Sequence, residues 1–194
     1  MTRTTLLGMA LAVLTSVGVL AGCGDNTHTT SDPGTTHGAQ GVHNEADVAF
    51  ASQMIPHHAQ AVEMATLVHH TGNLKVLALA DRIDKAQARE IATMTTWLRA
   101  RGVHVPASGD TTESDHSMPG MAPHDDMNQL EQTKDAEFDR LWLSSMIRHH
   151  EGAIQMANTE LGQGSDEEMK RLARQILETQ QAEIAEMQAL LPRG

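Results

Sequence analysis

This sequence has very few aromatic residues and a single cysteine. It contains no tyrosine, two phenylalanines and two tryptophans in 194 residues, so aromatic rings can fill little of a core. Because Cys23 is the only cysteine, the chain cannot form an internal disulfide. The folded part must therefore be held together by packing.

Positive charge is also scarce. Lysine and arginine number 14 against 25 aspartates and glutamates, which gives a net charge of −11 with neutral histidines. Binding of nucleic acid depends on clustered lysine and arginine, so this balance argues against a nucleic-acid partner. It suits solubility and a cationic ligand, although an acidic surface is also consistent with simple solvation.

The N-terminus has the features of an export signal. Arg3 precedes an apolar run from Leu6 to Leu20, which is short for a membrane span of about 20 residues. The sequence Leu20-Ala-Gly-Cys23 resembles the bacterial lipobox, which implies cleavage before Cys23 and lipid attachment to its sulfur. We expect a signal peptide at residues 1–22 and a lipoprotein on the outer, or periplasmic, face of the cell membrane. A plain secretory signal is the alternative.

The remaining chain predicts a tether and four helices. Residues 23–43 are small and polar and cannot offset the entropy of ordering, so they form a flexible tether. Amphipathic periodicity then favours helices, and no strand-like alternation is present. Asn44 is a plausible N-cap. The expected helices run from about Asn44 to His70, Asn73 to Arg101, Thr133 to Leu161 and Asp166 to Leu191, with a loop at about 103–127.

These helices contain an internal repeat. Met54-Ile-Pro-His-His58 and the residues up to Ala65 return as Met146-Ile-Arg-His-His150 up to Ala157. The following helices repeat as well, since Gln87, Glu90 and Met94 recur as Gln180, Glu183 and Met187. Neither helical hairpin can bury its apolar stripe alone. The pattern therefore predicts an all-α fold, an antiparallel four-helix bundle of two duplicated hairpins spanning residues 44–192.

The repeated polar residues fall beside the apolar stripes. Helical geometry puts His57 and His58 on either side of the face that carries Met54. Buried polar groups are costly unless they satisfy one another. Two explanations remain open. Each glutamate could pair with a histidine in a purely stabilising network, or the imidazoles and thioethers could bind a metal ion between helices.

The loop also gathers metal-ligand residue types. Imidazole and thioether groups at close spacing suit a soft ion, with methionine taking Cu(I) or Ag(I) and histidine taking either copper state. We interpret the segment as a ligand set, although drift in a low-complexity linker is the alternative. Its candidate ligands are His116, Met118, Met121, His124 and Met127.

The doubled Met-Ile-x-His-His motif and the Gln-x-x-Glu-Ile-x-x-Met helices resemble the domain-of-unknown-function family 305. The resemblance covers roughly residues 43–192 and implies a ferritin-like four-helix bundle, frequent export and, in some members, copper binding. It implies the metal ligands Met54, His57, His58, Met64, Met146, His149, His150 and Met156. The residues expected to surround these ligands are Gln87, Glu90, Met94, Gln180, Glu183 and Met187. Pro56 in the first copy corresponds to Arg148 in the second, so the two half-sites need not be equivalent.

These features predict a copper-binding or silver-binding protein rather than an enzyme. A di-iron centre would need two Glu-x-x-His motifs, and the helices contain none. No nucleophile–base pair or phosphate-binding loop is visible. We expect an extracytoplasmic, lipid-anchored protein that buffers Cu(I), Cu(II) or silver ions or delivers them to a transfer partner. The alternative is a structural or partner-binding lipoprotein domain whose His/Glu core only stabilises it.

Overall fold

The computed structural model describes residues 42–106 and 118–191, and in these ranges the protein is all-α. It contains five α-helices, one short 3₁₀ helix and no β-strand. The helices are α1 (Glu45–Thr66), α2 (Leu74–Ala100), α3 (His124–Gln132), α4 (Asp135–Gln163) and α5 (Glu167–Leu190), with η1 at Leu67–His70. The predicted signal peptide, Cys23 and most of the predicted tether lie outside the described residues.

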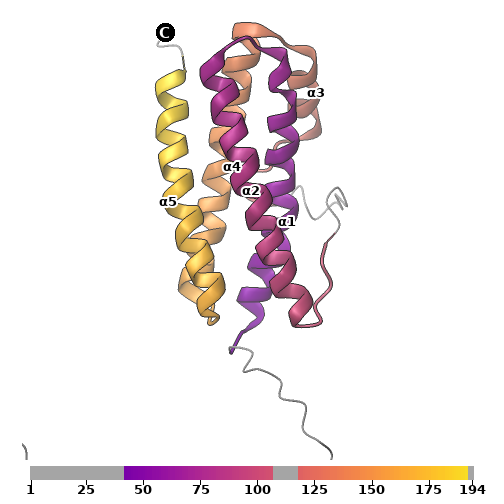
Figure 1. Cartoon of the computed structure of the whole chain (residues 1–194), viewed down its shortest axis with the longest axis vertical. Helices are drawn as coiled ribbons and strands as arrows, with labels where there is room; N and C mark the ends of the chain where they lie inside the picture. The colour runs from indigo at the N-terminus through magenta and orange to yellow at the C-terminus, as the bar shows by residue number, and fades with distance from the viewer. Residues whose placement is uncertain (1–41, 107–117, 192–194) are drawn as a thin grey trace, which may run out of the picture. The chain divides into compact units, whose positions relative to one another are not determined.

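Four long helices, α1, α2, α4 and α5, lie side by side (Figure 1). Their apolar side chains form two core clusters. The Phe50 cluster includes Phe50, Met54, Met94, Trp97, Met156, Met169 and Ile176. The Trp142 cluster includes Met64, Leu79, Ile83, Met127, Phe138, Trp142, Met146 and Met187.

The order in which each helix passes the two clusters gives its direction. Helices α1 and α5 pass the Phe50 cluster first, whereas α2 and α4 pass the Trp142 cluster first. Neighbours α1 and α2, α4 and α5, and α1 and α4 are therefore antiparallel. Because α2 and α4 point the same way, the end of α2 and the start of α4 lie at opposite ends of the bundle.

The predicted helix boundaries agree with the structure to within a few residues, and local signals explain why. Asn44 caps α1, and the Asp47 side chain accepts a hydrogen bond from the Asn44 backbone N–H, which completes a capping box. Gly102, with φ of +68°, follows the end of α2 in the conformation that glycine favours. Pro56 lies inside α1, and the helix continues through it.

Helix α3 corrects the prediction of a loop that continues to residue 127. The helix is only nine residues long and buries Met127 and Leu130. Two buried positions are too few to produce a recognisable periodicity in the sequence. The origin of the two hairpins by duplication and the ferritin-like relationship stay predictions.

Within the described ranges, no helix is long and apolar enough to cross a bilayer.

Candidate metal centre

A layer of buried polar side chains separates the two apolar clusters. Each of the four long helices contributes two residues to it, at the point where the helix passes from one cluster to the other. We call this set the polar layer. Its members are His57 and His58 of α1, Gln87 and Glu90 of α2, His149 and His150 of α4, and Gln180 and Glu183 of α5.

The histidines of the two sequence copies meet at the centre of the layer. The rings of His57 and His149 lie 3.8 Å apart between centroids, so α1 and α4 bring the first histidine of each copy into contact. The second histidine of each copy is also fully buried and meets a glutamate of the neighbouring helix. His58 Nε2 lies 2.8 Å from a Glu90 oxygen, and His150 Nε2 lies 2.9 Å from a Glu183 oxygen.

Hydrogen bonds decide which ring nitrogens remain available. A carboxylate accepts, so Nε2 of His58 and of His150 donates to the glutamate, and Nδ1 is the ring nitrogen that this bond leaves unused. His57 donates from Nε2 to the Pro119 carbonyl at 3.0 Å, which leaves the same nitrogen, Nδ1, as its lone-pair atom. All three Nδ1 atoms are buried without a hydrogen-bonding partner, as are both ring nitrogens of His149.

The central imidazoles are neutral at physiological pH. Burial, reinforced by the neighbouring His58, lowers the pKa of His57 to about 3. Burial and the nearby His57 hold the pKa of His149 well below its ordinary value. A neutral imidazole with an unpaired nitrogen is the form that binds a metal ion. The amides of Gln87 and Gln180 are also buried without partners, so the layer contains unused hydrogen-bonding capacity.

Buried methionines lie on both sides of the polar layer. Met54 and Met94 belong to the Phe50 cluster, whereas Met146 and Met187 belong to the Trp142 cluster, and all four are fully buried. The other two predicted methionine ligands, Met64 and Met156, also lie on opposite sides of the layer. Met64 belongs to the Trp142 cluster and Met156 to the Phe50 cluster. Thioethers are therefore present in the core on both sides of the polar layer.

The predicted loop ligands occupy different environments. Met118 is buried and Met121 is half-buried, whereas His124 is exposed at the start of α3. Met127 packs into the Trp142 cluster, so it has a role in the core. His116 lies outside the described residues.

Among the residues that the structure describes, no three or more His, Cys, Asp or Glu side chains are grouped closely enough to hold a metal ion. The polar layer instead offers imidazoles in pairs, with thioethers nearby. A site built from these groups would need sulfur ligands, which soft ions accept.

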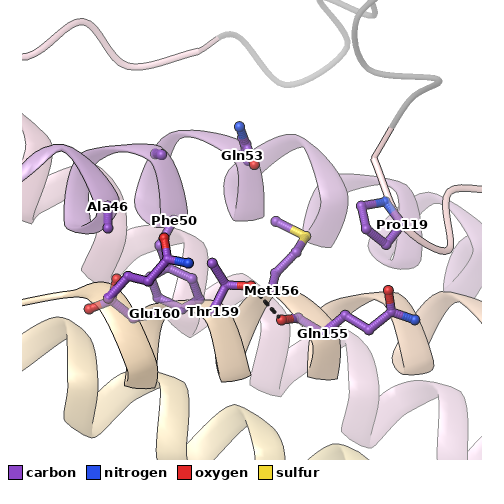
Figure 2. Close-up of a pocket in the computed structure, with 10 residues that line it drawn as sticks. Ala46, Phe50, Gln53, Pro119, Gln155, Met156, Thr159 and Glu160 are labelled. Atoms are coloured by element: carbon purple, nitrogen blue, oxygen red, sulfur yellow. Dashed lines mark hydrogen bonds between the residues drawn. The ribbon is translucent and has the colours of Figure 1, made fainter.

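Two grooves and one pocket lie on the surface of the bundle. Between α2 and α5, two overlapping grooves of about 530 and 570 Å³ are lined by Glu90 and Glu183, respectively. Between α1 and α4, a pocket of about 280 Å³ is lined by Phe50, Pro119 and Met156 among others. Figure 2 shows the Met156 side chain reaching from α4 toward α1 in this pocket.

Two buried carboxyl groups lie near this pocket. Burial alone would raise the pKa of Asp47, but backbone hydrogen bonds, first from Asn44 and then from Asp166, hold it below its ordinary value. Burial and the adjacent Asp47 carboxylate raise the pKa of Glu160 to about 8. Glu160 is therefore mostly protonated at neutral pH.

Sequence reasoning missed the residues that hold the Met118–Ala122 segment against the helices. Gln60 exchanges two hydrogen bonds with the Ala122 backbone, and Gly152 lies against Pro119. A signal was present, because Gln60 and Gly152 occupy the same position in the two copies of the repeat. The two copies differ at this position, and each residue contacts the Met118–Ala122 segment in its own way.

The fold and the site together define an all-α protein whose core is crossed by imidazole, carboxylate and amide groups. Residues 47–191 match the family model described as "Domain of unknown function (DUF305)", so the chain belongs to this family. No curated protein sequence matches the chain significantly.

Solved structures of several relatives are similar to this chain. A DUF305 protein of Streptomyces coelicolor, described as secreted, is 34% identical over 75% of this chain and 91% of that chain, with a TM-score of 0.68. A DUF305 fragment from Deinococcus radiodurans is 30% identical over 76% and 95%, with a TM-score of 0.69. CopM in its Cu(I)-bound form is 29% identical over 74% and 94%, with a TM-score of 0.61. CopM has also been solved with Cu(II) and with Ag bound.

Proposed function

We propose that this protein binds copper or silver ions outside the cytoplasm and buffers them or delivers them to a partner, without catalysing a reaction. It is attached to the membrane by a lipid on Cys23, and its two hairpins derive from one duplicated unit. Its relative CopM has been solved with Cu(I), Cu(II) and Ag, which supports the same ions here.

The observation that carries the proposal is the set of buried ring nitrogens without partners. Five such nitrogens lie in the polar layer, on His57, His58, His149 and His150. Leaving each one unpaired costs on the order of 1–3 kcal/mol of folding free energy. A layer that served stability alone would not be expected to contain five such atoms. Coordination would satisfy one nitrogen on each neutral ring, the one that carries the lone pair.

The glutamates would then support the ligands from outside. A carboxylate that accepts the Nε2 proton orients the ring and makes Nδ1 a better donor, as in many metal sites. Glu90 and Glu183 stand in this relation to His58 and His150. Both glutamate side chains reach the groove between α2 and α5, so an ion could approach the layer from that side.

The second candidate is a structural or partner-binding lipoprotein domain. The two His–Glu pairs favour it, because this pairing is what a stabilising network requires. It does not account for the unpaired nitrogens at the centre of the layer.

Titration of the mature protein with Cu(I) in competition with a chelating dye separates the two candidates. We expect the protein to take Cu(I) from the dye at micromolar concentration, and a His57→Leu/His149→Leu variant to take less. Failure of the wild-type protein to compete would reject metal binding and leave the structural role.

A further inference from the structure

The segment Met118–Ala122 contacts the helices beside the central imidazole pair. We propose that the turn Met118-Pro-Gly-Met121 and the rings of His57 and His149 form one composite soft-metal site. In this site the thioethers of the turn and the imidazole nitrogens bind the same Cu(I) or Ag(I) ion. This inference rests on the proposed function and deepens it, since the sequence presents the loop and the helical histidines as separate ligand sets.

The turn has a defined geometry. The Met121 N–H donates to the Met118 carbonyl at 3.4 Å, with Pro119 and Gly120 between them. Gly120 has φ of +80°, and proline followed by such a glycine is the signature of a type II turn. The first and last residues of a β-turn lie close together, so the two methionines lie on neighbouring positions.

Helix α1 holds the turn by hydrogen bonds. The Pro119 carbonyl accepts from His57 Nε2 at 3.0 Å, so the turn touches the imidazole pair directly. Immediately after the turn, the Gln60 side chain donates to the Ala122 carbonyl at 2.9 Å and accepts from the Ala122 N–H at 2.8 Å. The methionine side chain has three rotatable bonds, and in the proposed site its sulfur turns from this anchored backbone toward the rings.

Helix α4 supplies the space. A Cβ on Gly152 would lie 1.9 Å from the Pro119 oxygen, and a Cβ on Gly120 would lie 2.5 Å from the Arg148 oxygen. Only glycine at both positions allows the two backbones to touch. Gln60 and Gly152 are counterparts in the repeat, so one copy provides hydrogen bonds and the other provides room. Both helices are therefore adapted to seat this turn.

The seated turn makes the two central histidines different. His57 keeps only Nδ1 for a ligand, whereas neither ring nitrogen of His149 has a hydrogen-bonding partner. Met118 is buried and Met121 is half-buried beside this pair of helices. Two imidazoles and two thioethers form a ligand set that suits a soft monovalent ion.

The Gly152→Ala variant tests whether the turn is held by its contacts with α1 and α4, which we call the seat of the turn. Alanine favours a helix over glycine by about 1 kcal/mol, so α4 should remain folded while the added methyl group displaces the turn. Gly162→Ala is the matched control. Gly162 lies on the same helix, and a Cβ there meets nothing within 4 Å. In the apo protein, we expect the Ala122 amide to exchange faster with solvent in Gly152→Ala and in Gln60→Ala, but not in Gly162→Ala or in Gln175→Ala, an exposed site on α5.

A titration with Ag(I), followed by NMR of ¹³C-methyl methionine and of the imidazole rings, tests the composite site. In the wild-type protein, the signals of Met118, Met121 and His149 should change together and saturate at the same equivalent of Ag(I). Met118→Leu/Met121→Leu and Gly152→Ala should each weaken Ag(I) binding at the imidazoles by about 10–100-fold.

The outcomes separate this inference from the proposed function. Saturation of the methionine and histidine signals at different equivalents, or unchanged Ag(I) affinity in both variants, would overturn the composite site alone. Absence of any Ag(I) or Cu(I) binding by the wild-type protein would overturn the proposed function as well.

Discussion

At the scale of single residues, the partners of a buried group decide its charge. Asp47 and Glu160 are both almost fully buried, at 0% and 1% exposed. Asp47 accepts hydrogen bonds from the backbone of Asn44, Ser165 and Asp166, which stabilise its carboxylate. Glu160 has no such donors and lies beside this negative charge, so its proton is retained.

The raised pKa of Glu160 has a consequence for stability. Below pH 4.5 the carboxyl is protonated in the folded and unfolded states, so it has no effect. As pH rises from 4.5 to about 8, only the unfolded state loses the proton, and the free energy of unfolding falls. We expect Glu160→Gln to raise that free energy by on the order of 1–2 kcal/mol at pH 8, and by little at pH 4.

Urea unfolding of Glu160→Gln at the two pH values measures this difference. Glu178→Gln, at an exposed position on α5, is the matched control and should change neither value. An equal gain from Glu160→Gln at both pH values would show that ionisation is not the cause.

At the scale of the elements, aspartates near the start of α1 and α4 connect the two hairpins. Asp47 of α1 accepts hydrogen bonds from the backbone of Ser165 and Asp166, where α5 begins. Its counterpart in the repeat, Asp139 of α4, accepts from the Asn73 side chain, where α2 begins. The start of one helix in each hairpin is thus tied to the opposite hairpin.

The two ties differ in strength, which leads to a prediction. Asp47→Ala leaves buried N–H groups at the start of α5 and the cap of α1 without an acceptor, so we expect it to lower the free energy of unfolding by about 2–4 kcal/mol. Asp139→Ala removes one side-chain bond and should cost about 0.5–1.5 kcal/mol. Thermal unfolding of both variants shows which one loses more free energy of unfolding. A larger decrease in Asp139→Ala than in Asp47→Ala would contradict this account.

At the scale of the whole molecule, the polar layer interrupts what could be one continuous apolar core. The Phe50 and Trp142 clusters lie on its two sides, and every long helix contributes to both. Replacing both partners of a buried hydrogen bond by apolar residues of similar shape can be nearly neutral or stabilising. A layer kept for metal binding should therefore be dispensable for folding.

The pair His58 and Glu90 allows this to be measured. We expect His58→Leu/Glu90→Met to leave the free energy of unfolding unchanged or to raise it by about 1–4 kcal/mol, while Cu(I) affinity falls. Glu90→Met alone should lower stability by about 1–3 kcal/mol, because the buried Nε2–H of His58 loses its acceptor. A double variant less stable than the single one would favour a purely structural layer.

Much of the fold and part of the candidate site could be predicted from local pattern. The four long helices follow from periodicity and from caps such as Asn44, because both signals span only a few neighbouring residues. Helix α3 was missed because it has too few buried positions to show a period. The seat formed by Gln60 and Gly152 was missed because it depends on a segment some 60 residues away from Gln60 along the chain.

The sequence by itself determined that imidazole, amide and carboxylate groups lie on the core-facing sides of the helices, since the position of a side chain on a helix depends only on its spacing. Only the tertiary structure decided that His57 meets His149, that the second histidine of each copy meets a glutamate, and that the Met118–Met121 turn touches the central pair. These contacts join segments far apart in the chain, and the packing of helices against one another selects them.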